Sequence, residues 1–256
     1  ERHPQAVLDQ AQLALAASGF EEMSLLSLSS GDYCQIQHLL AAVMARFAHQ
    51  KVAISFPSLR VGTLTQELME LVRTVRKTGF TLAPEAGSER LRRVINKGIC
   101  REDLLVAAEQ ALGLGWLVLK LYFMMGLPTE TRADLHELVE LSLEVWRLAA
   151  RQKRKASVNV AVSTFVPKPQ TPFQWAGQIP LDMIQDNVAY LDEKLRRRGL
   201  RFKWHDPHQS RLEAVFARGD RRLFTVLLRA WELGARFDGW TERFQRTLWQ
   251  QAFDET

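Results

Sequence analysis

Two stretches decide the fold of this chain: EAGSER at residues 85–90 and MMGLPTET at residues 124–131. In each, an apolar segment that predicts a β-strand passes directly into an amphipathic segment that predicts an α-helix. Strand ends of this kind meet at one edge of an α/β barrel, where small ligands bind. The two stretches therefore predict a ligand-binding edge formed by parallel strands.

On both sides of these two stretches, apolar segments and amphipathic helical segments alternate along the chain. Their spacing is typical of βα units, whose crossovers make parallel strands with helices outside. A lone helix beginning at Pro4 precedes the first strand, so we expect one further strand upstream of this sequence. The fold class predicted is α/β, a partial (β/α)6 TIM-like barrel that lacks its first strand. The expected strands are Met23–Leu28, Val52–Phe56, Phe80–Ala83, Trp116–Met124 and Val158–Phe165.

The character of the sequence changes after Pro180. A helix over Leu181–Arg198 and an edge strand over Leu200–Trp204 are predicted, followed by helical segments rich in aromatic residues. Large rings at helical spacing are more typical of packing than of a cofactor site. We therefore predict a partial barrel over residues 1–180, holding strands two to six, and a mainly helical C-terminal extension over residues 181–256 packed on it.

Composition excludes several classes of protein. The 256 residues are 46% hydrophobic and 25% charged, which is ordinary for a globular protein. No apolar run approaches the roughly 20 residues of a membrane span. Two cysteines favour a reducing cytoplasm over a disulfide scaffold. The net charge of +5 is concentrated near predicted helix ends, which favours dipole complementation over an RNA-binding surface.

The residues after the third predicted strand carry ligand-binding chemistry. The Glu85 carboxylate can accept two hydrogen bonds from a ribose diol, and the Lys97 ammonium can pair with a carboxylate. Ser88 is suited to cap the following helix. Capping and helix-dipole rules alone also explain an acid at the start of a helix and Lys97-Gly98 at its end.

Three other strand ends carry similar signals. SSGD at residues 29–32 exposes backbone groups to a ligand, because its side chains are small. Gly126, after Met125, lets the backbone approach a flat ligand, and Pro128 stiffens the turn. Phe165-Val166 opens a proline-rich exit loop, which in isolation is only a rigid loop.

Taken in order, these segments resemble the core of a radical S-adenosylmethionine (radical SAM) enzyme, from Met23 to Phe173. The resemblance implies that SSGD meets the methionine amino group, Glu85 the ribose and Lys97 the methionine carboxylate. It places adenine against the backbone at the ends of the last two strands. The cofactor-binding set that it implies is Ser29, Ser30, Gly31, Asp32, Ser55, Glu85, Ser88, Lys97, Met125, Gly126, Phe165 and Val166.

Over the whole chain the sequence resembles uncharacterised radical SAM proteins that carry an upstream cobalamin-binding domain. That likeness continues through residues 203–207, 216–222 and 237–240. It implies SAM, a [4Fe-4S] cluster, possible use of cobalamin and an external electron donor. The intact enzyme would cleave SAM reductively to a 5′-deoxyadenosyl radical that abstracts hydrogen from a substrate.

One departure from the family concerns the cluster. The family's Cys-x-x-x-Cys-x-x-Cys loop has no counterpart here and is expected before Glu1. Cys34 and Cys100 are too few to replace it, since cluster ligation needs several convergent thiolates. We therefore expect no metal ligands in this chain and little or no activity from it alone. Catalytic residues and substrate are not identified.

Three alternatives stay open. The first is a methylthiotransferase-like RNA-modifying enzyme, which shares the Gly-Ser and Gly-Leu-Pro segments. A C-terminal RNA-binding β-barrel would support it, but the aromatic C-terminal segments predict helices. A non-catalytic barrel could serve as a binding module. An ordinary phosphate-binding barrel would carry glycine-rich loops after its last strands, where this chain has Pro167-Lys168-Pro169.

Overall fold

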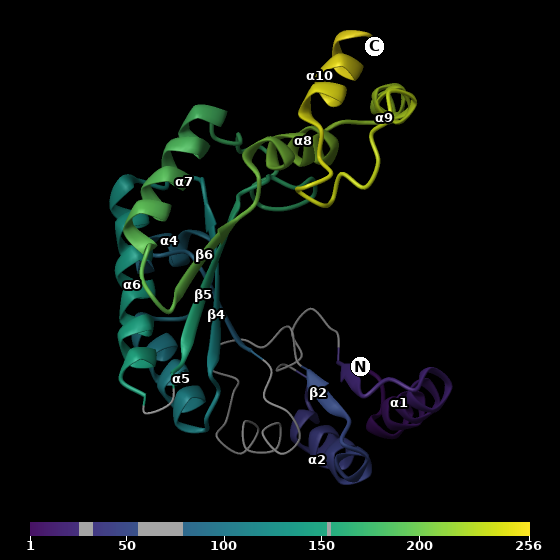
Figure 1. The fold of residues 1–256 in the computed structure, drawn as a ribbon, viewed down its shortest axis with the longest axis vertical. Coiled ribbons are helices and arrows are strands. Elements are labelled where there is room, and N and C mark those ends of the chain that lie inside the picture. The colour runs from purple at the N-terminus through teal and green to yellow at the C-terminus, as the bar shows by residue number, and fades with distance from the viewer. Residues whose placement is uncertain (26–32, 56–78, 153–154) are drawn as a thin grey trace.

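A parallel four-stranded sheet forms the centre of the computed structural model, which describes residues 1–25, 33–55, 79–152 and 155–256. Its strands follow chain order, β3-β4-β5-β6, and all neighbours are parallel (Figure 1). Parallel neighbours need crossover connections, and helices supply them here. The strands are β3 (Phe80–Glu85), β4 (Val118–Met125), β5 (Ser157–Thr164) and β6 (Leu200–Trp204).

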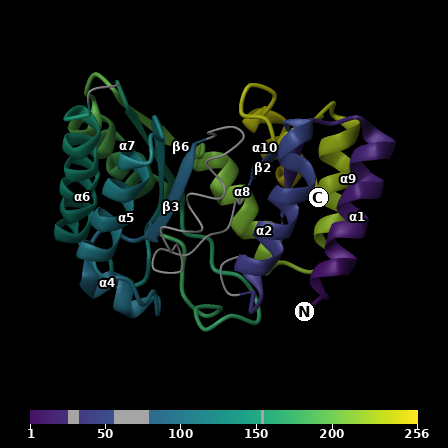
Figure 2. The same ribbon diagram turned by 90° about the horizontal axis from the view of Figure 1, so that it is seen from below.

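Helices cover one side of this sheet. Figures 1 and 2 show α4, α5, α6 and α7 together on that side, with the remaining helices on the other. Side chains that face the helices are buried, among them Leu121 in β4 and Val160 in β5. Burial alternates along both strands, as expected when one face of a strand packs on helices. The helices are α4 (Glu89–Val94), α5 (Arg101–Gly113), α6 (Arg132–Ala150) and α7 (Leu181–Leu195).

The opposite face of the sheet is more polar. Lys120 in β4 lies beside Asn159 in β5, which in turn lies beside Arg201 in β6. Tyr122 is 43% exposed on the same face of β4. The Asn159 Oδ1 atom is buried and has no hydrogen-bond partner among the described residues. In a closed barrel this face of the sheet lines the interior.

The N-terminal elements form a smaller unit with its own apolar cluster. Strand β1 (Glu22–Ser24) pairs in parallel with β2 (Ala53–Ser55), and α1 (Pro4–Ser18) packs on α2 (Ile36–Phe47) through Leu8, Val43 and Phe47. A short 3-10 helix, η2 (Ala48–Gln50), follows α2. Helix α1 ends as the sequence predicts, at Gly19 with a left-handed φ of 69°.

The C-terminal elements are helical, as predicted. Helices α8 (Pro207–Arg218), α9 (Leu223–Glu232) and α10 (Arg246–Asp254) share an apolar cluster that contains Trp249. The expectation that the aromatic rings pack holds for Phe216, which meets Trp249 edge to face at 5.6 Å. It is wrong for Trp231 and Trp240, which are 56% and 65% exposed, because the small helical unit buries only one face of α9 and little of the loop before α10.

The predicted fold class is confirmed, since the structure is α/β with a parallel sheet whose strands alternate with helices. For the strands that lie wholly in the described residues, the predicted ends agree within a few residues, and the expected strand over Leu200–Trp204 forms the edge of the sheet as β6. The ends predicted at Leu28 and Phe56 lie outside the described residues. The division at residue 180 stays a prediction, and the sheet itself continues past it. The apolar spacing of residues 65–75 also predicts a helix, and these residues lie outside the described ones.

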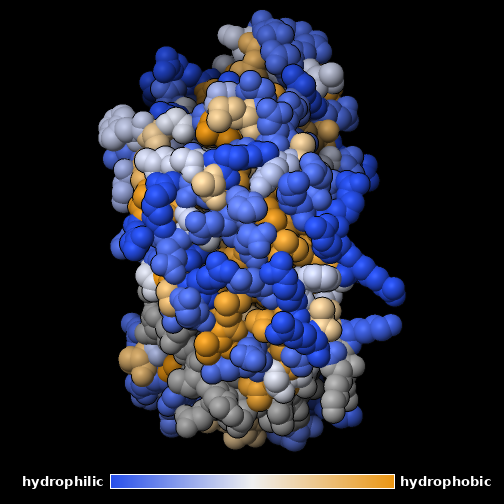
Figure 3. All heavy atoms as spheres, turned by 90° about the vertical axis from the view of Figure 1, so that its left-hand side faces the viewer, coloured by the Kyte–Doolittle hydropathy of each residue, from blue (hydrophilic) through white to orange (hydrophobic). Residues whose placement is uncertain are grey.

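The outer surface over α4 to α7 is mainly hydrophilic, with small scattered apolar areas (Figure 3). In the part of the chain that the structure describes, no helix combines the length and apolar character needed to cross a bilayer.

Candidate functional site

Glu85, the last residue of β3, stands at the carboxyl edge of the sheet in an unusual backbone conformation. Its φ of 66° is left-handed, which is uncommon for a residue other than glycine. Lys97, twelve positions later, places its Nζ atom 3.3 Å from Glu85 Oε1. Both side chains are partly exposed, at 30% for Glu85 and 23% for Lys97. The structure thus brings together two candidate residues of the segment that follows the third predicted strand.

The turn at residues 85–88, which we call the β3 turn, packs directly against the backbone of α6. A Cβ atom on Gly87 would lie only 2.3 Å from Leu138 N and 2.6 Å from Asp134 O, so only glycine fits. Ser88 caps α4, since its hydroxyl accepts from Leu91 N at 3.1 Å. The same hydroxyl donates to Asp134. The cap confirms the local prediction, while cofactor binding by Ser88 stays a prediction.

The buried side chain of Arg92 stabilises the β3 turn through hydrogen bonds to its backbone. The sequence analysis did not identify this residue. Its side chain is buried, and its guanidinium donates to Ala86 O at 3.0 Å, Gly87 O at 2.8 Å and Ile99 O at 3.1 Å. Burial lowers the pKa of Arg92, because it penalises the charged form. Nothing in the sequence separates Arg92 from its neighbour Arg93, since both read as helix arginines.

Asp134, in the first turn of α6, joins the β3 turn to the turn after β4. Arg90 reaches Asp134 Oδ2 at 2.5 Å and Thr129 O at 2.8 Å. Burial opposes ionisation of Asp134, but hydrogen bonds from Arg90, Ser88 and Thr131 outweigh it and hold the pKa of this carboxyl well below its usual range. The two turns are therefore one connected unit.

The turn after β4 is shaped by Gly126 and Glu130. Gly126 has a φ of 76° and donates its N–H to Glu130 Oε1 at 2.8 Å. Burial raises the pKa of Glu130 to about 7, against the opposing effect of backbone hydrogen bonds from Gly126 and Leu127. The Met125 side chain is buried in the core, and its carbonyl accepts from Phe165 N at 2.8 Å. The side chain of Met125 is therefore not at the edge, and cofactor binding by its backbone stays a prediction.

The loop after β5 carries the remaining described candidates. Phe165 is buried and meets Phe173 edge to face at 6.0 Å. Gln178 Nε2 donates to Phe165 O at 3.4 Å. Val166 is half-buried beside it. The roles of Phe165 and Val166 in cofactor binding stay predictions.

The other sequence candidates are not tested by the structure. Ser29, Ser30, Gly31 and Asp32 lie outside the described residues. Ser55 ends β2, but its side chain also lies outside them. Their roles stay predictions.

The described residues contain no group of three or more His, Cys, Asp or Glu side chains able to hold a metal ion. The Cys34 thiol contacts Glu1 Oε2 at 2.7 Å, and the Cys100 sulfur caps α5 by accepting from Asp103 N at 3.4 Å. Each thiol is thus occupied locally and stands far from the other in sequence. Neither begins a cluster-binding site in this part of the chain.

Comparisons with known proteins bear on the family and the fold of the chain. The model of the Radical SAM superfamily matches residues 1–142. The chain is 34% identical over 206 residues to an uncharacterized protein, MJ0966, of Methanocaldococcus jannaschii, a match that covers 80% of this chain and 43% of that protein.

Among solved structures, SuiB of Streptococcus suis resembles this chain with a TM-score of 0.56 at 14% identity. The similarity covers 80% of this chain and 44% of SuiB, and it concerns the fold. The chain thus spans less than half the length of the relatives it matches.

Proposed function

This chain belongs to the radical SAM superfamily, and from that premise we propose that its carboxyl edge binds S-adenosylmethionine in an iron–sulfur enzyme that abstracts hydrogen from a substrate. The observation that carries the proposal is the Glu85–Lys97 pair at the end of β3. A carboxylate and an ammonium placed together match the two polar ends of SAM, the ribose diol and the methionine carboxylate.

The geometry of this pair fits such a ligand. Both side chains reach solvent, so their 3.3 Å contact contributes only about 0–1 kcal/mol to stability, and a ligand can replace it at little cost in free energy. SAM can then take over both partners, with Glu85 accepting from the ribose and Lys97 donating to the methionine carboxylate. Arg92 and Asp134 keep the β3 turn in place while these side chains change partners.

The adenine end is assigned to backbone at Gly126 and at Phe165-Val166. Phe165 N donates to the Met125 carbonyl, which ties the two strand ends to each other. Glu130 stabilises the turn at Gly126, because its carboxylate accepts a hydrogen bond from the Gly126 N–H. These contacts support a rigid surface for a flat ring, although the ligand role of each residue is a proposal.

Superfamily membership implies a [4Fe-4S] cluster, yet the described residues do not fit one, because they bring no set of thiolates together. We propose that the cluster ligands lie elsewhere in the whole protein and that this chain alone does not cleave SAM. When both are bound, cluster and SAM supply hydrogen-atom abstraction. The chain's own contribution is to bind and orient SAM.

Several finer assignments rest on the sequence. The resemblance implies an external electron donor and possible use of cobalamin. The two cysteines favour a cytoplasmic location, and the helical aromatic tail favours a substrate other than RNA. Neither an RNA-modifying role nor a non-catalytic binding module gains a specific observation from the structure.

The test uses the whole protein, reconstituted anaerobically with iron and sulfide, and measures 5′-deoxyadenosine formed from SAM under reductant. We expect Glu85→Gln and Lys97→Met each to raise the KM for SAM roughly tenfold, the loss of one charge-assisted hydrogen bond. The matched control is Glu193→Gln, which removes an exposed ion pair with Lys194 on α7. Unchanged KM in both edge variants, or no cleavage by the wild-type protein, overturns the proposal.

A further inference from the structure

The face of the sheet that α4 to α7 leave uncovered carries three cations. The strand register aligns six of its residues, because partners on neighbouring parallel strands point the same way. They are Lys120 and Tyr122 of β4, Asn159 and Ala161 of β5, and Arg201 and Lys203 of β6. We call these six residues the inner face. None of them is buried, whereas Leu121 and Val160, on the opposite face, are fully buried.

The cations of the inner face have no counterion on the sheet. The side chains of Lys120, Arg201 and Lys203 make no hydrogen bond or ion pair with another described residue. The four strands, all of them described, contain one acidic residue, Glu85, which lies at the carboxyl edge beside Lys97. The inner face therefore carries positive charge that no described residue neutralises.

Lys120 is the most informative of the three cations, because β4 is a central strand. Cations on an edge strand such as β6 also discourage pairing with another chain, and that reason does not apply to β4. Lys120 is half-buried, and its Cε atom lies 2.6 Å from the point where a Cβ on Gly79 would stand, so glycine leaves the space that this side chain occupies. A half-buried ammonium is costly unless it is paired. Its position favours a ligand that brings the negative charge.

The middle of the inner face offers further contacts to an organic ligand. Ala161 lies between Tyr122 and Lys203 in the register, so no bulky side chain separates them. Tyr122 is 43% exposed, and its hydroxyl can donate to a ligand. A ligand above Ala161 would therefore meet an aromatic ring on one side and an ammonium on the other.

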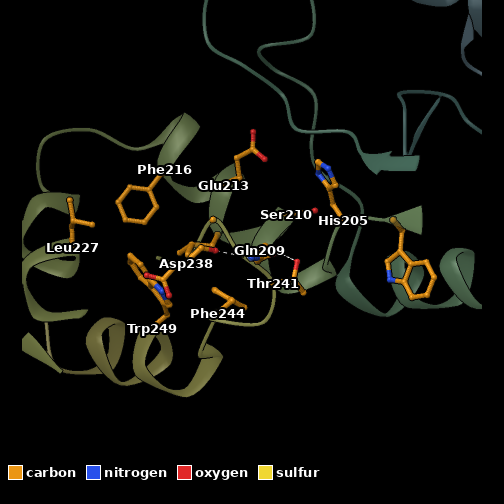
Figure 4. Close-up of a pocket in the computed structure, with 13 residues that line it drawn as sticks. His205, Gln209, Ser210, Glu213, Phe216, Leu227, Asp238, Thr241, Phe244 and Trp249 are labelled. Carbon is orange, nitrogen blue, oxygen red and sulfur yellow. Dashed lines mark hydrogen bonds between the residues drawn. The ribbon is translucent and has the colours of Figure 1, made fainter. Parts of the chain in front are cut away.

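The cavity beside α8, of about 580 Å³, is a poorer place for an anion. Figure 4 shows Glu213 and Asp238 among its lining residues, together with the rings of Phe216 and Phe244. Among the described residues, no lysine or arginine lines it. Carboxylates repel an anion, so the inner face suits a negatively charged ligand better than this cavity does.

We infer that the substrate is a small organic anion, whose carboxylate or phosphate group the inner face neutralises. The inference rests on the proposed function and names the charge of the substrate for that reaction. Tyr122 lies three residues before Met125, the last residue of β4, which is roughly 10 Å along a strand. A small substrate held beside Tyr122 and Lys203 can therefore extend toward the carboxyl edge, where SAM is proposed to bind.

The test is calorimetric titration of the chain at low ionic strength with inorganic phosphate, with succinate and with succinamide, which lacks the charges of succinate. We expect phosphate or succinate to bind, succinamide not to bind, and the affinity to fall as salt is added, because salt screens the attraction. The anion that binds more tightly distinguishes a phosphate from a carboxylate substrate. Absence of binding by both anions, or equal binding of succinate and succinamide, overturns the inference.

Substitutions locate the bound anion. Lys120→Met and Lys203→Met each remove one cation, and we expect each to weaken binding of that anion roughly fivefold. The matched controls are Arg93→Met, exposed on α4, and Thr241→Val, in the cavity beside α8, and both should leave binding unchanged. Unchanged affinity in either inner-face variant, or an equal loss in Arg93→Met, overturns the inference.

A second measurement separates this inference from the proposed function. Lys120 lies five residues before Met125, roughly 16 Å along the strand, so Lys120→Met should leave the KM for SAM unchanged in the reconstituted whole protein. A raised KM would assign Lys120 to SAM and overturn the inference. Anion binding without SAM cleavage by the wild-type protein overturns the proposed function and keeps the anion site, whereas SAM cleavage without anion binding overturns the inference alone.

Discussion

The β3 turn and the C-terminal region, residues 207–256, treat buried polar groups in opposite ways. In the β3 turn, the Arg92 guanidinium meets three carbonyls, and the Ser88 hydroxyl both donates and accepts. In the C-terminal region, Asp238 Oδ1 and Trp249 Nε1 are buried and have no hydrogen-bond partner among the described residues. The turn satisfies its buried polar groups internally, while the C-terminal region leaves these two unpaired.

The largest effect expected on the turn follows from its close packing. Gly87→Ala puts a Cβ atom against the α6 backbone, 2.3 Å from Leu138 N, where no flexible side chain can move aside. We expect a loss of about 3 kcal/mol in the free energy of unfolding, measured by urea denaturation. Gly98→Ala is the control, because a Cβ there meets nothing within 4 Å. Equal stability of the two variants would show that the turn does not pack on α6.

Arg92 gives the next largest effect. Arg92→Met keeps the length of the side chain but leaves the Ala86, Gly87 and Ile99 carbonyls without their donor. We expect about 2–3 kcal/mol of destabilisation in the same denaturation experiment. Arg93→Met, on the exposed side of α4, is the matched control and should change stability little. Unchanged stability of Arg92→Met would show that the hydrogen bonds of Arg92 do not hold the β3 turn in place.

Glu130 makes the same edge sensitive to pH. Its pKa in the folded chain, about 7, exceeds the unfolded value of 4.5, so the folded state holds its proton more tightly. The contribution of Glu130 to the free energy of unfolding is therefore greatest below pH 4.5. It falls as the pH rises through 7, by about 2 kcal/mol between pH 5 and pH 8. Asp134, whose pKa is lowered, stays ionised over that window and adds no slope.

Glu130→Gln isolates this contribution. In urea denaturation, the free energy of unfolding of this variant should fall less between pH 5 and pH 8 than that of the wild-type chain. Glu137→Gln, exposed on α6, should show the wild-type decrease. The same pH dependence in Glu130→Gln and in the wild-type chain would refute the assignment.

The smallest effect has the opposite sign and belongs to the C-terminal region. Asp238→Ala removes a buried acceptor that has no partner among the described residues, so it should raise the free energy of unfolding by about 0.5–1 kcal/mol. Asp220→Ala removes a carboxylate that accepts from Arg222 N at 3.0 Å and should lower stability. If both variants are destabilised alike, Asp238 has a partner within the protein and the contrast between the regions fails.

The position of the β3 edge is easier to predict from the sequence than the unpaired atoms of the C-terminal region, for physical reasons. The alternation of strands and helices fixes which residues reach the carboxyl edge, so Glu85 and Lys97 follow from strand ends and local spacing. Arg92 could not be found this way, because its burial depends on how α4 packs beneath a turn. The open atoms at Asp238 and Trp249 depend on contacts among β6, α8 and α10, which no local pattern records.

The account's central claim is that Glu85 holds the ribose of SAM and Lys97 its methionine carboxylate. The most direct test compares binding of SAM and 5′-methylthioadenosine, which keeps the ribose but lacks the methionine carboxylate, in the reconstituted whole protein. We expect Glu85→Gln to weaken both ligands roughly tenfold and Lys97→Met to weaken SAM alone. Equal weakening of both ligands by Lys97→Met, or no effect of Glu85→Gln, would contradict the claim.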